Sequence, residues 1–243
     1  DREDKIIGIV AENRLETYAS ILSALICGKT YVILHPSYPK HRNDRIADSA
    51  GIRLVLHTEN IHVLNLDTRN LELICTSEIE QAENSATFHA AEDILHTAEE
   101  ENAYIIFTPG STGEPKGVPI SRRNLNAFYT AYHRLDWQLD ENDRMLQMFE
   151  LTFDVSIVSF LYPLGACIYT VSPEGVKYIN VIETLEKYDL TFAAVAPSLL
   201  QLLRPYFPEI HLPALRYLVV TAEASDAELL DAFRKCVPNA SFI

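Results

Sequence analysis

The stretch 104–118 combines the residue types that hold a phosphate group. It contains three glycines, the hydroxyls of Thr108, Ser111 and Thr112, and the ammonium of Lys116. Glycine lets backbone N–H groups approach a ligand, hydroxyls donate hydrogen bonds, and lysine supplies a positive charge. A turn-rich loop between strands has a similar composition. Composition alone therefore leaves two interpretations open, a polyphosphate site and a plain turn.

The order of residues excludes a Walker P-loop. Pro115 stands where that motif has its second glycine, and Gly117 stands where it has the Ser or Thr that binds magnesium. Pro115 also disfavours the α conformation at Glu114. Because Tyr104 to Phe107 has strand character, we expect the chain to pass from a strand through this loop into another strand.

Asp154 is the most informative charge further along the chain. It lies in the run Phe153-Asp154-Val155-Ser156, where an apolar segment begins that must be buried. A carboxylate in this position can cap the N-terminus of a helix, or it can bind a cationic ligand. The residues by themselves favour the cap.

Composition restricts the partners of the chain. The sequence has 243 residues, 48% of them hydrophobic, and a net charge of −14. This charge argues against nucleic acid and against an anionic membrane surface. An acidic protein that binds a polyphosphate needs local donors and a metal ion, here Lys116 and Mg²⁺. Arg122 and Arg123 are also near, although a solvated helix start is the favoured interpretation of this pair.

The cellular environment follows from what the sequence lacks. No apolar run is long enough to cross a bilayer, and no basic-then-apolar signal peptide opens the chain. The four cysteines are scattered without a C-x-x-C pair, which indicates free, buried thiols. We expect a cytoplasmic protein with no membrane insertion.

Apolar periodicity predicts an α/β fold. Strand-like and helix-like segments alternate through most of the chain, which implies largely parallel sheets covered by helices. Residues 77–102 are acidic and poor in large apolar residues, as in a linker. We therefore expect a first Rossmann-like lobe at 1–76, a linker at 77–102 and a second lobe at 103–243. Ser121 is the expected N-cap of the helix that follows the glycine-rich loop.

The stretch 104–118 resembles the phosphate-binding signature of the adenylate-forming, or AMP-binding, enzymes, with Pro109 where that family usually has Ser. The resemblance implies an ATP-dependent ligase with Mg²⁺ in which Lys116 and Thr108 are catalytic. The residues that it assigns to ATP are Thr108, Gly110, Ser111, Thr112, Gly113, Lys116 and Gly117.

Two further segments resemble one branch of that family, the amino acid adenylation domains of peptide synthetases and D-alanine–carrier protein ligases. These are the segment 25–36, followed by Tyr38-Pro39, and the Phe-Asp-x-Ser run at 153–156. The resemblance implies that Asp154 holds the ammonium of a small amino acid, which a carrier-protein phosphopantetheine thiol later accepts. The pocket walls that it implies are Val155, Val158, Val195, Val219 and Thr221.

The resemblance also predicts that this chain is an incomplete large domain. The family's magnesium-binding Glu and catalytic Lys are expected beyond Ile243, so we expect no metal ligand within the chain and no adenylate formation by the chain alone. Thr221-Ala222-Glu223 replaces the family's usual Gly-Gly-Glu. Two alternatives stay open: a fragment of an acyl-CoA or aryl-CoA ligase, and a non-catalytic nucleotide-binding remnant.

Overall fold

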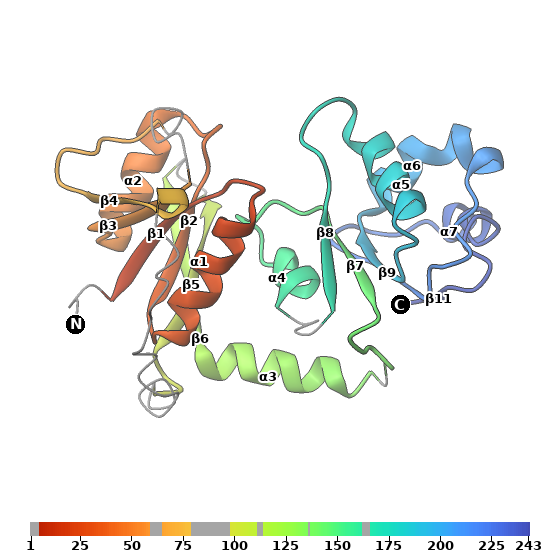
Figure 1. Ribbon diagram of the computed structural model, residues 1–243, viewed down its shortest axis with the longest axis horizontal. Coiled ribbons are helices and arrows are strands. Elements are labelled where there is room, and N and C mark those ends of the chain that lie inside the picture. Colours follow the sequence, from red (N-terminus) through yellow and green to blue (C-terminus); the bar gives the residue numbers. More distant parts are fainter. Residues whose placement is uncertain (1–4, 59–64, 79–97, 111–113, 136, 162–165) are drawn as a thin grey trace. The chain divides into compact units, whose positions relative to one another are not determined.

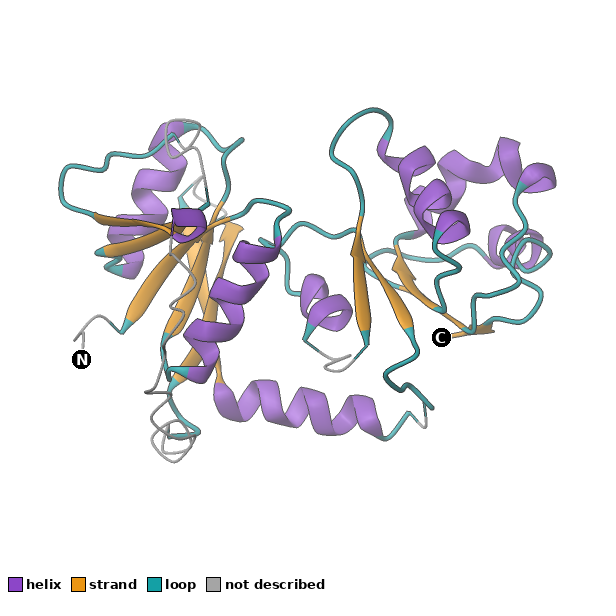
Figure 2. Ribbon diagram, in the orientation of Figure 1, coloured by secondary structure: helices purple, strands orange, loops and turns teal. Residues whose placement is uncertain are grey.

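A computed structural model describes residues 5–58, 65–78, 98–110, 114–135, 137–161 and 166–243. Contacts divide the chain into two compact units, Asp1–Leu135 and Asp136–Ile243. Figures 1 and 2 show helices and strands in both units. Each unit is described by itself below.

The first unit is built on a six-stranded sheet in the order β4-β3-β1-β2-β5-β6. Its strands are β1 (Ile6–Val10), β2 (Thr30–Leu34), β3 (Leu54–His57), β4 (Glu72–Cys75), β5 (Asn102–Pro109) and β6 (Pro115–Ser121), and its helices are α1 (Leu15–Ile26), α2 (Lys40–Ala50) and α3 (Arg122–His133). All neighbouring strands are parallel except β5 and β6, which are antiparallel. The predicted strand–loop–strand passage at 104–118 is therefore confirmed, as a hairpin.

Apolar residues of the central strands form the core of this unit. Val32 and Leu34 of β2 alternate toward one face of the sheet, where they pack with Val55 of β3 and with Ile46 and Ala47 of α2. The α2 helix ends at Gly51, which adopts the left-handed conformation. The sheet that carries the glycine-rich hairpin is thus anchored by buried aliphatic side chains.

The second unit is a five-stranded parallel sheet in the order β11-β10-β9-β7-β8. Its strands are β7 (Arg144–Gln147), β8 (Cys167–Thr170), β9 (Phe192–Val195), β10 (Tyr217–Val220) and β11 (Ser241–Phe242), and its helices are α4 (Val155–Phe160), α5 (Lys177–Lys187), α6 (Pro197–Leu203) and α7 (Ala227–Phe233). Residues of α5, α6 and α7 pack against one face of the sheet, and Val158 of α4 packs against residues that point the other way.

The boundary between the two units lies at a different residue from the one that the sequence predicted. The predicted second lobe began at residue 103, yet β5 pairs with β2 and β6 pairs with β5, so both strands belong to the first sheet. The contacts of the first unit extend to Leu135. Backbone pairing between segments far apart in sequence decides this boundary, and local composition does not record it. Most of the acidic segment 77–102 lies outside the described residues.

Two predictions from the sequence concern membrane-spanning segments and the burial of the cysteines. Among the described residues, no helix is long and apolar enough to cross a membrane. All four cysteines are free, but only Cys236 is buried, because Cys27 and Cys167 are exposed and Cys75 is intermediate. The expectation of buried thiols was therefore wrong at three positions: Cys27 at the end of α1, Cys75 at the end of β4 and Cys167 at the start of β8.

Candidate functional site

The β5–β6 hairpin carries the candidate phosphate site. Thr108 pairs with Lys116 and Phe107 with Gly117 across the two strands. At the tip, the Gly110 N–H donates to the Glu114 carbonyl over 3.0 Å, which closes the turn. The hairpin thereby places Thr108 and Lys116 side by side next to its tip, and both residues are exposed.

Packing explains two of the predicted glycines. A Cβ on Gly110 would lie 2.2 Å from the Glu114 carbonyl oxygen, which is closer than any side chain tolerates. A Cβ on Gly117 would lie 3.0 Å from Cζ of Phe107 and 3.1 Å from Cγ2 of Ile105. Both glycines therefore shape the hairpin, and the Gly110 N–H is already used in the turn. Ser111, Thr112 and Gly113 lie outside the described residues.

Lys116 supplies the cation that the sequence predicted for this site. Its ammonium has no hydrogen-bond or ion-pair partner among the described residues. Within the described ranges, the Thr108 hydroxyl makes one long hydrogen bond, 3.4 Å, to the Lys116 carbonyl. Both side chains are thus available to an anion. Glu114, at the same tip, forms an ion pair with Arg45 of α2.

Arg122 and Arg123 have other partners. The Arg122 guanidinium donates to the Leu25 carbonyl over 2.9 Å and to the Lys29 carbonyl over 3.2 Å, and its burial lowers its pKa. Arg123 pairs with the carboxylates of Glu99 and Glu100. The arginines therefore hold the start of α3 to its own unit. Ser121 caps that helix as predicted, because its side chain accepts from the Asn124 N–H over 3.1 Å.

The topology of the second unit marks a second candidate site. Strands β7 and β9 are neighbours, yet the chain leaves β7 toward α4 on one face and leaves β9 toward α6 on the other. Such a reversal opens a crevice beyond the carboxyl ends of the two strands, where parallel α/β sheets bind ligands. Asp154 lies on the segment that follows β7, so the sheet presents it at this edge.

Asp154 occupies the N-cap position of α4 but makes no side-chain cap hydrogen bond. Its carboxylate also has no ion-pair partner among the described residues. The side chain is exposed, because α4 begins at the rim of the sheet and only its later residues enter the core.

The structure brings some of the predicted pocket residues together and separates one of them. Val158 packs against a buried cluster that contains Val219 and Ala194. Val195 is 2% exposed and belongs to the opposite core, beneath α5, α6 and α7. Val155 is half-buried in the first turn of α4. Since residues 192–195 are all apolar, sequence could not tell which two of them face α4, and Ala194 was missed for this reason.

The segment after β10 joins this edge. The Thr221 N–H donates to the Val195 carbonyl over 3.0 Å. Ala222 has a φ of 75°, a left-handed conformation that favours glycine, which the resembling family has here. Glu223 then accepts from the backbone and hydroxyl of Ser198 over 3.0 and 2.9 Å. The carboxyl ends of β9 and β10 are therefore held together by one carboxylate.

Gln147 is a further residue of this edge that the sequence did not single out. It ends β7, is 3% exposed, and donates from its amide nitrogen to the Phe149 carbonyl over 3.1 Å. Its amide oxygen is buried and has no hydrogen-bond partner within the described part of the chain. The sequence feature that could have identified Gln147 is its place as a polar residue inside the otherwise apolar run Met145 to Phe149.

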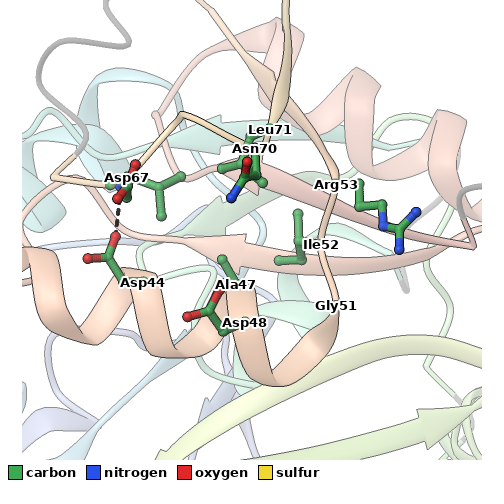
Figure 3. A pocket seen from close by; sticks show the side chains of 10 residues that line it. Asp44, Ala47, Asp48, Gly51, Ile52, Arg53, Asp67, Asn70 and Leu71 are labelled. Atoms are coloured by element: carbon green, nitrogen blue, oxygen red, sulfur yellow. Dashed lines mark hydrogen bonds between the residues drawn. The ribbon is translucent and has the colours of Figure 1, made fainter.

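The first unit also contains a pocket that none of the predicted site residues lines. It has a volume of about 410 Å³ and lies between α2 and the segment 66–71, as Figure 3 shows. Asp44 accepts there from the Asp67 N–H over 2.7 Å, and the Arg69 side chain lowers the pKa of Asp67. Across the described residues, no group of three or more His, Cys, Asp or Glu side chains could hold a metal ion.

The chain is similar to known proteins over nearly its whole length. The family model of the AMP-binding enzymes matches residues 1–243. A linear gramicidin synthase protein of Brevibacillus parabrevis is 31% identical over 94% of this chain, and the match covers 3% of the synthase. Zwittermicin A synthase ZmaJ of Bacillus cereus is 27% identical over 96% of this chain and 44% of its own length.

Solved structures show the same fold. A nonribosomal peptide synthetase, FmoA3, in its α-methyl-L-serine-AMP-bound form has a TM-score of 0.84 at 25% identity, covering 99% of this chain and 27% of that one. The Vibrio cholerae adenylation domain AlmE, in complex with glycyl-adenosine-5'-phosphate, has a TM-score of 0.81 at 21% identity, covering 98% and 50%. The chain thus spans half or less of each of these proteins. Because the family model matches it from end to end, this chain belongs to the AMP-binding enzyme family.

Proposed function

We propose that this chain is the part of an amino-acid-activating ligase that binds ATP and begins the amino acid pocket. The observation that carries the proposal is the hairpin at 102–121 in a chain that belongs to the AMP-binding enzymes. The tip of this hairpin presents the ammonium of Lys116, which has no partner among the described residues. Because the chain spans only part of its relatives, the activity is proposed for the whole polypeptide that carries it.

The described hairpin residues fit the polyphosphate of ATP. Within the described part of the chain, Lys116 offers a positive charge without a partner and Thr108 a hydroxyl with one long hydrogen bond. The reaction joins the amino acid carboxylate to the α-phosphorus of ATP and releases pyrophosphate. The role of Lys116 is to orient the outer phosphates and to offset the charge that develops on the leaving group. Magnesium, when bound, would add positive charge that offsets the same leaving group, although no group of three or more His, Cys, Asp or Glu side chains among the described residues would hold it.

The proposal that the substrate is an amino acid rests on Asp154. Its carboxylate has no cap bond and stands at the carboxyl edge of the second sheet, one helical turn before Val158. An ammonium group is the natural partner of a free carboxylate at a ligand-binding edge. Val158, Ala194 and Val219 then limit the side chain to a small aliphatic one. A carrier-protein phosphopantetheine thiol is the proposed acceptor of the aminoacyl group.

The test compares ATP–pyrophosphate exchange by the complete protein for amino acids and their des-amino analogues. We expect exchange with small aliphatic amino acids such as alanine or valine, and little with propionate or isovalerate. Equal exchange with alanine and propionate would assign the protein to the acyl ligases instead. Binding of ATP without exchange for any acid would assign it to non-catalytic nucleotide-binding proteins.

A further inference from the structure

The tip of the β5–β6 hairpin carries two opposite charges close together in sequence. Glu114 is the acidic residue nearest to Lys116 along the chain, two positions away. If these side chains paired with each other, the positive charge of Lys116 would be lost to an incoming anion. In the structure the Glu114 carboxylate instead forms an ion pair with Arg45 of α2, which lies 69 positions earlier in the sequence.

Arg45 makes this contact although two acidic residues, Asp44 and Asp48, lie nearer to it in the sequence, on its own helix. Asp44 is occupied by Lys40, over 2.7 Å, and by the Asp67 N–H. Asp48 lies one turn after Arg45, at a spacing that allows a pair, yet its carboxylate forms no ion pair with any described residue. The guanidinium therefore reaches across to the hairpin and neutralises Glu114.

We propose that Arg45 is a positioning residue that acts through Glu114: by pairing with this carboxylate, it keeps the Lys116 ammonium free for a polyphosphate. The identification of the anion as a polyphosphate rests on the function proposed above. The competition between Arg45 and Lys116 for the Glu114 carboxylate is independent of that function. Both members of the Arg45–Glu114 pair are about half exposed, so the pair contributes little to folding stability. Its effect is expected on anion affinity.

A double-mutant cycle tests the proposal on the 243-residue chain, with R45Q, E114Q and the double variant, and with K40Q as a control that removes a like charge from the same helix. Calorimetry with inorganic tripolyphosphate and with ATP gives the affinities. We expect R45Q to weaken binding about twofold to fivefold, the range for one exposed charge pair. E114Q and K40Q should bind as the wild type does, and the double variant should recover wild-type affinity.

A second measurement needs no nucleotide. The rate of acetylation of the Lys116 amine is followed by mass spectrometry. It should be lower in R45Q, because the Glu114 carboxylate then pairs with Lys116 in place of Arg45. It should return to the wild-type rate in R45Q/E114Q, which has no carboxylate at position 114. This pattern in a wild-type chain that binds neither anion would support the positioning role and count against the proposed function. An unchanged acetylation rate in R45Q, or a double variant that binds as weakly as R45Q, would overturn the proposal.

Discussion

Arg216 donates from Nη1 to Oδ1 of Asp143 over 2.9 Å, and the Asp143 side chain has no exposed surface. The same carboxylate accepts from the Thr191 hydroxyl over 2.6 Å and from the Asp140 N–H over 2.8 Å. These residues lie just before β7, β9 and β10. One buried carboxylate therefore ties together the amino ends of three neighbouring strands, at the edge opposite to the candidate ligand site.

Asp143→Ala should unfold the second unit at lower denaturant concentration. The substitution leaves a guanidinium, a hydroxyl and a backbone N–H without their shared acceptor, at a cost of about 3 kcal/mol. Urea titration followed by circular dichroism measures the change. Glu141→Ala, an exposed acidic residue two positions away, is the matched control and should stay within about 0.5 kcal/mol of the wild type. Equal midpoints for the two variants would contradict the structural role of Asp143.

Ala222→Gly should stabilise the protein. Ala222 has a φ of 75°, where an alanine is disfavoured and a glycine is not. The gain, after allowing for the greater freedom of glycine in the unfolded chain, is about 0.5–1 kcal/mol. Ala232→Gly, inside α7, should instead destabilise by about 0.5–1 kcal/mol, because glycine is disfavoured in a helix interior. Thermal unfolding of the two variants therefore gives shifts of opposite sign if the left-handed backbone at 222 is present in solution.

Lys116→Ala in the complete protein should lower the rate of pyrophosphate exchange by roughly tenfold to a thousandfold, the range for one preorganised charge partner. The loss follows from the Lys116 ammonium at the hairpin tip, which pairs with none of the residues that the structure describes. Lys235→Ala removes an exposed lysine from the second unit and is the control for net charge. A rate in Lys116→Ala that equals the control would reduce the hairpin to a structural element.

Asp154→Ala should weaken activation of amino acids while leaving ATP binding intact. The side chain is exposed in the free chain, so the loss is that of a charge-assisted hydrogen bond, about 1.5–3 kcal/mol, and corresponds to roughly tenfold to a hundredfold. Pyrophosphate exchange at saturating ATP measures it. The des-amino acids provide the internal control, since their exchange should not fall in the variant.

Alkaline pH should destabilise the first unit through Tyr31. This side chain is 2% exposed and stacks on Tyr104 at 5.4 Å, and burial raises its pKa well above the ordinary value of 10.0. A raised pKa in the folded state means that stability is fully present below pH 10 and is lost as pH rises above it. Tyr31→Phe should flatten the fall of unfolding free energy above about pH 10. A fall as steep in Tyr31→Phe as in the wild type would place the alkaline transition elsewhere.

The sequence by itself determined the fold class, the order of the elements and the family. Apolar periodicity marks local segments, and turns and caps such as Ser121 and Gly51 act within a few residues of themselves, so these features are recorded locally. The signature at 104–118 likewise lies within one stretch of chain. The strand after Pro115 followed from a steric rule about the residue before proline.

Only the tertiary structure decided where the chain divides into two units, which residues of a buried strand point to each face of the sheet, and which charged side chains pair with one another. The pairing of β5 with β2 moved the boundary to Leu135, and no local pattern encodes such a long-range contact. In β9, a strand that is apolar on both sides, only the sheet could separate Val195 from Ala194. The ion pair between Arg45 and Glu114 joins residues 69 positions apart, and packing of α2 beside the hairpin is what brings them into contact.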